Sequence, residues 1–132
     1  MSNRDGRPRL LEPGLYGLSN HLLETLWLKV RNGKSALGRV LDAGPRIASL
    51  LGLLADTSPA PDAELVHTGA GLERERMLSA ARIVSPDYGM RCSSVAIIEN
   101  SGRLQFAERG YDPAGEAIET RRYELHLSME IE

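Results

Sequence analysis

The sequence predicts an α+β fold, with helices in the middle of the chain and an antiparallel sheet at its end. Apolar residues recur at helical spacing between His21 and Ala55 and again from Leu72 to Ala81. The last forty residues instead contain a continuous apolar run and two alternating runs separated by turn residues, which is typical of strands. Helices followed by strands favour α+β over an alternating βαβ order.

The first half of the chain is expected to contain a short strand and three helices. Residues 1–14 are polar and turn-rich, which predicts a flexible lead-in, and residues 15–132 are assigned to one domain portion. Leu15–Leu18 predicts a brief strand that stops at the capping residues Ser19 and Asn20. The expected helices run from His21 to Val30, ended by Asn32-Gly33, then from Ser35 to near Gly44-Pro45, and then from Arg46 to Ala55.

A polar linker precedes the fourth predicted helix. Residues 56–61 contain two prolines and little to bury, which predicts an exposed segment. The helix is expected over Leu72–Ala81, and its alternating charges at residues 73–76 are interpreted as a solvated face. Its expected core-facing residues are Leu72, Met77, Leu78 and Ala81.

The end of the chain predicts a three-stranded antiparallel meander. Val95–Ile98 is continuously apolar and is expected to be covered on both faces. Glu99–Gly102 has the composition of a hairpin turn, and Leu104–Arg109 and Thr120–Ile131 alternate between apolar and polar residues. The helices can cover one face of this sheet, but the other face has no obvious partner. The sheet therefore indicates either missing chain or a homo-oligomer.

The composition excludes several classes of function. A net charge of −2 argues against nucleic-acid binding, because neutralising phosphates requires a clustered basic surface. The longest apolar stretch is far shorter than the ~20 residues that cross a bilayer, so no transmembrane segment is expected. The N-terminus lacks the apolar region of a signal peptide. A single cysteine, Cys92, suits a reducing compartment, so we expect a cytoplasmic protein or, in a eukaryote, an organellar one.

No metal site or cofactor is predicted. His21, His67 and His126 are widely separated, and Cys92 has no second ligand at a metal-binding spacing. Gly69-Ala70-Gly71 lacks the preceding strand and following lysine of a phosphate-binding loop, so it is interpreted as a flexible lead-in to a helix.

Two residues are candidates for a nucleophile, and the interpretation favours neither. Cys92 follows an arginine that would lower a thiol pKa, but no base is marked and free cysteine is commonly a small buried residue. Ser2 would become N-terminal on removal of Met1, and its own amino group would then serve as a base. Such a nucleophile must be held rigidly, whereas residues 3–8 are turn material.

Asn20 and Arg91 are the remaining candidate site residues. Each is a polar residue beside a short predicted strand. An asparagine can donate its amide to an oxyanion, and an arginine can clamp a carboxylate or hold the charge of a nucleophile. Spacing alone fits a helix cap and a surface charge equally well.

Several segments of the sequence resemble the NRDE family, also called the transport and Golgi organisation family. The resemblance covers nearly the whole chain, in order. It rests on Ser2–Gly6, Leu11–Leu23, Trp27–Val30, Gly33-Lys34, Thr68-Gly69, Glu73–Ser79, Tyr88–Val95 and Phe106–Arg109.

The resemblance implies a fold and two site roles. The family is similar to N-terminal nucleophile hydrolases, which have a four-layer αββα sandwich and cleave amides. Its members begin with Met-Cys followed by an Asn-Arg-Asp-Glu motif, and this chain has neither, so the front half of the family's chain is expected to be absent. By this similarity, Asn20 is an oxyanion-hole side chain and Arg91 an active-site arginine near the nucleophile. Leu26, Leu28 and Met90 depart from the family's usual residues beside the pocket.

The leading hypothesis is therefore a C-terminal portion of an NRDE-like domain without a complete catalytic centre, inactive alone as an amide hydrolase. Its small-molecule ligand is unknown. The alternatives are a binding or transfer module for haem or lipid and a homo-oligomeric scaffold. Residues considered for an apolar ligand pocket are Met77, Met90, Tyr88 and His21.

Overall fold

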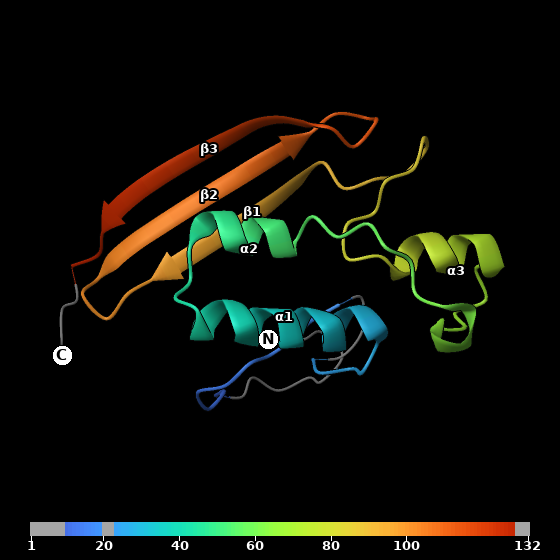
Figure 1. Cartoon of the computed structure of the whole chain (residues 1–132), viewed down its shortest axis with the longest axis horizontal. Helices are drawn as coiled ribbons and strands as arrows, with labels where there is room; N and C mark the ends of the chain where they lie inside the picture. The colour runs from blue at the N-terminus through green and yellow to red at the C-terminus, as the bar shows by residue number, and fades with distance from the viewer. Residues whose placement is uncertain (1–9, 20–22, 129–132) are drawn as a thin grey trace.

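The computed structural model describes residues 10–19 and 23–128, and these form an α+β structure (Figure 1). The predicted fold class is therefore confirmed. The elements in chain order are α1 (Leu28–Asp42), α2 (Ile47–Leu53), the short 3₁₀ helix η1 (Asp62–Glu64), α3 (Leu72–Ser79), β1 (Cys92–Ile98), β2 (Arg103–Tyr111) and β3 (Ala117–His126).

One long helix, α1, replaces two of the predicted helices. It begins at Leu28 rather than near His21 and continues through Asn32-Gly33, where a helix end was wrongly predicted. A glycine inside a helix costs only about 1 kcal/mol relative to alanine, and packing of the helix can offset that cost. The helix does end as predicted near Gly44, whose φ of 85° is the left-handed conformation typical of the residue after a helix.

The predicted strand at Leu15–Leu18 is wrong, because this segment is irregular and packs on α1. A Cβ atom added at Gly17 would lie 2.5 Å from a methyl group of Val30, so the segment touches the helix closely. Glu24 holds it there. The Glu24 N–H donates to the Gly17 carbonyl (2.9 Å), while its carboxylate accepts the Gly17 N–H and pairs with Lys34 on α1.

The three strands form the predicted antiparallel meander in the order β1-β2-β3. In its register, Val95 lies opposite Ala107, which in turn lies opposite Arg122. Helix α2 packs on β1 and β2, and α1 packs on α2, which gives the layered arrangement of Figure 1. The core cluster between α2 and the sheet consists of Ile47, Leu51, Val95 and Ala107, with Leu50, Leu54 and Ile97 packed around it.

The second face of the sheet is apolar and open, which corrects the expectation that Val95–Ile98 is covered on both sides. Val95 is buried beneath α2, whereas Ile98 is 64% exposed on the opposite face. We call this opposite side the outer face. Its apolar residues, read from the strand register, are Ala96, Ile98, Leu104, Phe106, Tyr123 and Leu125.

Helix α3 forms where predicted but buries a different residue. Leu72 is half exposed, and the buried side chain is Glu75, which was interpreted as part of a solvated face. Its carboxylate accepts hydrogen bonds from the Thr68 N–H (2.7 Å), the Thr68 hydroxyl (2.6 Å) and the Ala70 N–H (3.3 Å). These bonds, chiefly that from the Thr68 hydroxyl, lower the pKa of Glu75. The carboxylate thus anchors the loop before the helix.

Candidate functional site

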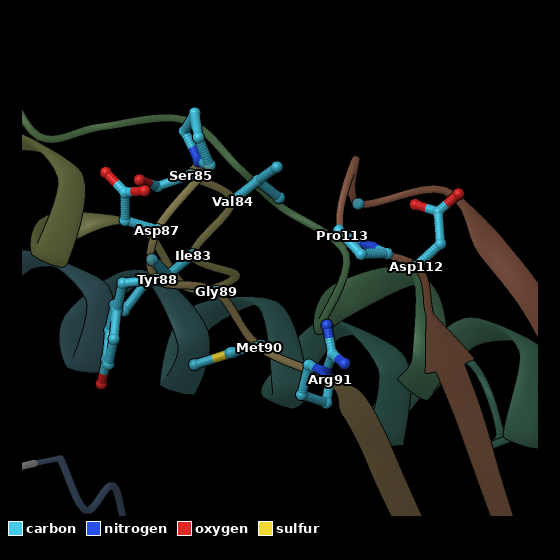
Figure 2. A pocket seen from close by; sticks show the side chains of 12 residues that line it. Ile83, Val84, Ser85, Asp87, Tyr88, Gly89, Met90, Arg91, Asp112 and Pro113 are labelled. Atoms are coloured by element: carbon cyan, nitrogen blue, oxygen red, sulfur yellow. The ribbon is translucent and has the colours of Figure 1, made fainter.

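A small pocket lies where β1 begins, and Arg91 is one of its walls. It has a volume of about 230 Å³ and is lined by residues 83–91 and by residues 112, 113 and 115. The Tyr111 N–H donates to the Arg91 carbonyl (2.9 Å), so the backbone of Arg91 is fixed to the end of β2. Figure 2 shows its guanidinium pointing up between the two loops. The predicted site residue therefore lines a cavity.

The first wall is a closed loop over residues 83–90. Ile83 is buried, and its carbonyl accepts a hydrogen bond from the Met90 N–H (2.9 Å), which joins the two ends of the loop. Gly89 lies against the same carbonyl, which a Cβ atom at this position would approach to 3.3 Å. The loop therefore carries Ser85, Asp87 and Tyr88 on a fixed base, with their side chains directed away from Arg91 in Figure 2.

The second wall is the turn between β2 and β3. The Gly115 N–H donates to the Asp112 carbonyl (2.9 Å), and the Asp112 carboxylate accepts the Glu116 N–H (2.9 Å). Gly115 has a φ of 85°, and a Cβ atom there would lie 2.7 and 2.9 Å from the two methyl groups of Val84. Only glycine lets the turn and the first loop approach so closely.

Arg82 joins these walls to the helical layer, and the sequence analysis did not identify it. Its guanidinium donates to the carbonyls of Gly115 (2.8 Å) and Ala55 (3.3 Å) and lies 4.6 Å from the ring centroid of Tyr111. Tyr111 is buried, and its hydroxyl donates to the Ser93 hydroxyl (3.3 Å). Because its hydrogen-bond acceptors are main-chain carbonyls distant in sequence, no motif signals this role.

The Arg91 guanidinium is available to a ligand, because the acidic side chains around the pocket do not pair with it. Its side chain makes no hydrogen bond or ion pair with the part of the chain that the structure describes. Asp112 is engaged by the turn, and Figure 2 shows Asp87 directed away from Arg91. Pockets for drug-sized ligands usually measure ~300–1,000 Å³. This one suits a single small polar group, such as a carboxylate or an amide.

Among the other candidate residues, only Cys92 is described by the structure, and it does not line this pocket. Asn20, His21 and Ser2 lie outside the described residues. The segment that leads to Asn20 packs on α1, on the side away from the sheet in Figure 1. Cys92 is free and exposed, on the strand position next to Arg91.

The cavity does not bring together all of the residues considered for an apolar ligand pocket. Tyr88 and Met90 line it, but Met77 lies on α3 and does not. Within residues 10–19 and 23–128, no three His, Cys, Asp or Glu side chains lie close enough together to hold a metal ion. Within the same ranges, no helix has both the length and the apolar character needed to span a bilayer.

Fold and pocket together define an α+β protein with a helix-covered antiparallel meander and a small arginine-lined cavity. The chain belongs to the Transport and Golgi organisation 2 family, whose family model matches residues 1–113, and this confirms the resemblance. The bovine (Bos taurus) Transport and Golgi organization protein 2 homolog is 37% identical over 138 residues, covering 95% of this chain and 49% of the relative. The human (Homo sapiens) homolog is 36% identical over 131 residues, covering 91% and 47%. The mouse (Mus musculus) Transport and Golgi organization 2 homolog is 30% identical over 130 residues, with the same two shares. The chain spans about half the length of these curated relatives.

Proposed function

We propose that this chain supplies the anion-holding part of an amide-hydrolase-like site, with Arg91 as the residue that holds the ligand's anionic group. The observation that carries the proposal is an arginine without a partner among the described residues, directed into a cavity of about 230 Å³. A guanidinium offers several donors in a fixed plane, which matches the two oxygens of a carboxylate.

The framework of the pocket suits this role. The backbone of Arg91 is bonded to Tyr111, and both flanking loops are closed by their own hydrogen bonds. A side chain on a fixed backbone loses less freedom on binding, which favours the anchoring of a small ligand. The 83–90 loop forms one wall of the cavity beside this side chain.

The reacting groups of the proposed site come from elsewhere. Asn20 is the proposed oxyanion donor, and the nucleophile is proposed to lie on polypeptide beyond this chain. The relatives are about twice as long as the matched region, which is consistent with a shared site. We accordingly propose that the chain alone does not hydrolyse amides. The proposed setting is the cytoplasm, and free Cys92 is compatible with its reducing conditions.

Binding of N-acetylglycine, a small amide that carries a carboxylate, tests the role of Arg91. Titration of the full chain followed by NMR should shift the Arg91 side-chain resonances and those of residues 83–90, with a millimolar Kd. Arg91→Gln should weaken binding at least tenfold. Arg74→Gln, which removes a charge from the exposed side of α3, should leave it unchanged. Equal weakening by both variants would mean that only net charge matters and would defeat the proposal.

Hydrolysis assays test the other half of the proposal. The chain should show no activity above background on a panel of acyl amides, and Ser2→Ala should change nothing. Robust hydrolysis that Ser2→Ala abolishes would show that the nucleophile is in this chain. Titration with haem serves as a further check, because a Soret shift at micromolar haem would favour the binding-module alternative.

A further inference from the structure

A second cavity lies between the first turn of α1 and helix α3, and it shares no lining residue with the Arg91 pocket. Its volume is about 230 Å³. In Figure 1 the first turn of α1 points toward α3, and the Lys29 ammonium joins the two helices by donating to the Leu78 carbonyl (2.9 Å). The apolar side chains of the lining are those of Trp27, Leu28, Val66 and Leu78. Apolar walls with a few polar groups are typical of small-molecule sites.

Lys29 brings to this cavity a positive charge with unused donors. An ammonium group has three N–H donors, and within the described residues Lys29 uses one of them, on the Leu78 carbonyl. Its nitrogen lies 5.7 Å from the centroid of the Trp27 ring, and burial lowers the pKa of Lys29. The ammonium has thus lost part of its hydration, so it would attract an anionic group that enters the cavity.

Glu75 brings the opposite charge from α3. Its side chain is buried, and the hydrogen bonds from Thr68 and Ala70 are all accepted by one oxygen, Oε1. The other oxygen, Oε2, accepts none from the described residues and is open to the cavity that Glu75 lines. The same hydrogen bonds lower the pKa of Glu75, which keeps the carboxylate ionised at neutral pH. A free carboxylate oxygen in this position can accept a hydrogen bond from a ligand ammonium.

The two charges are held apart in the cavity. No ion pair joins Lys29 and Glu75 in the described part of the chain. Leu78, whose carbonyl holds the Lys29 ammonium, follows Glu75 by one helical turn, which is about 5 Å along the helix axis. The remaining acidic side chain of the lining, that of Glu64, is paired with Arg31. The cavity therefore offers one cation and one anion, set roughly a helical turn apart.

These charges and this size fit a small apolar α-amino acid. Its ammonium and carboxylate are attached to the same carbon, so with hydrogen bonds of ~2.9 Å at each end the zwitterion can bridge two opposite charges that do not touch. At the ~30 Å³ that a molecule takes up in liquid water, the cavity has room for roughly eight heavy atoms. That is the size of valine or leucine, whose side chain would contact the apolar walls.

We propose that this cavity binds a small apolar α-amino acid, whose carboxylate pairs with Lys29 and whose ammonium pairs with Glu75. The site is independent of the Arg91 pocket. For a ligand as small as leucine, we expect a Kd of about 0.1–1 mM.

Titrations of the full chain followed by NMR test the proposal with leucine and two analogues. Leucinamide lacks the carboxylate, and 4-methylpentanoate lacks the ammonium. Leucine should shift the resonances of Trp27, Lys29 and Val66. Each analogue should bind about tenfold more weakly or worse, because it leaves one charged group of the cavity without a partner.

Three variants test the two charges separately. Lys29→Gln should weaken leucine binding about tenfold or more, whereas Arg74→Gln, which removes the same charge from the exposed side of α3, should change it less than about twofold. Glu75→Gln retains an oxygen for the hydrogen bonds of the loop. It should weaken the binding of leucine but tighten that of 4-methylpentanoate, because it removes a negative charge that repels the carboxylate. A general loss of structure would not produce these opposite signs, and circular dichroism checks that each variant remains folded.

Four results would overturn the proposal. The first is the absence of shifts at Trp27, Lys29 and Val66 in ~20 mM leucine, well above the expected Kd. The second is equal binding of leucine, leucinamide and 4-methylpentanoate, since the two charges would then play no part. The third is equal weakening by Lys29→Gln and Arg74→Gln, which would mean that only net charge matters. The fourth is a set of shifts confined to residues 83–91, which would place the carboxylate of leucine at Arg91 instead.

Discussion

Replacement of Gly115 by alanine perturbs the junction between the two walls of the pocket. The new Cβ atom would lie 2.7 and 2.9 Å from the two methyl groups of Val84 and 3.3 Å from the Arg82 guanidinium. Rotation about the Val84 Cα–Cβ bond cannot relieve both contacts. Two of the three staggered positions on Cβ always hold methyl groups, so at least one stays directed at the turn.

The cost has two parts. A φ of 85° is unfavourable for any residue with a Cβ atom, by roughly 1–2 kcal/mol, partly offset by the reduced freedom of the unfolded chain. Overpacking against Val84 adds roughly 1–3 kcal/mol. We therefore expect Gly115→Ala to lower the free energy of unfolding by about 2–4 kcal/mol. For a domain of this size, that corresponds to a drop in Tm of about 10 °C.

Gly44 supplies a matched control. It also has a φ of 85°, but a Cβ atom there would meet nothing within 4 Å. Gly44→Ala should therefore show only the backbone part, about 1 kcal/mol. Urea unfolding of Gly115→Ala, Val84→Ala and the double variant should give a favourable coupling energy of about 1–3 kcal/mol, because Val84→Ala removes the methyl groups that clash. Equal costs at Gly115 and Gly44, or a coupling energy near zero, would refute the reasoning.

Three further variants test other parts of the structure. Asp87→Asn removes a negative charge from the pocket lining and should tighten binding of N-acetylglycine about two- to fourfold at low ionic strength, an effect that should vanish in ~0.5 M salt if it is electrostatic. The pKa of Glu75 is lowered from 4.5, so its stabilising contribution is complete above the unfolded value and is lost as pH falls through the folded one. Glu75→Gln should therefore lower Tm at pH 7 and flatten the decline of Tm between pH 5 and pH 3, and an unchanged pH profile would contradict the role of its hydrogen bonds. Gly17→Ala would place a Cβ atom 2.5 Å from Val30 and should displace residues 10–19 from α1. Amide hydrogen exchange would detect this displacement as faster exchange at Glu24, whose N–H donates to the Gly17 carbonyl. Protection of Glu24 equal to the wild type would show that the segment is not packed there.

The fold class was predictable because its signals are local. Alternation along β2 and β3 and the turn at Glu99–Gly102 define the meander without knowledge of distant contacts. The helix boundary at Asn32-Gly33 was not predictable in this way. Two residues that favour turns lie inside α1, because tertiary packing of α1 on α2 outweighs their local preference. Leu15–Leu18 has strand composition but packs on a helix.

The candidate site was predictable only in part. Its type and its place before a strand made Arg91 a candidate without separating it from a surface charge, and the structure shows that it lines a pocket. The walls of that pocket depend on Gly115 meeting Val84 and on Arg82 meeting main-chain carbonyls, which are contacts between distant segments without a motif. The burial of Glu75 was missed for the same reason, since its partners are backbone groups and one hydroxyl of the preceding loop.

The position of Arg82 makes the pocket and the helical layer one cooperative unit. Its guanidinium bridges Ala55 after α2, the ring of Tyr111 at the end of β2 and the turn at Gly115. The backbone N–H of Arg82 also donates to the Asp56 carbonyl (2.8 Å). Opening the turn therefore also weakens the attachment of the segment after α2, and the two regions should lose hydrogen-exchange protection together. A ligand bound at Arg91 would then also stabilise the contacts of Arg82, by an amount that grows with the logarithm of the free ligand concentration above its Kd.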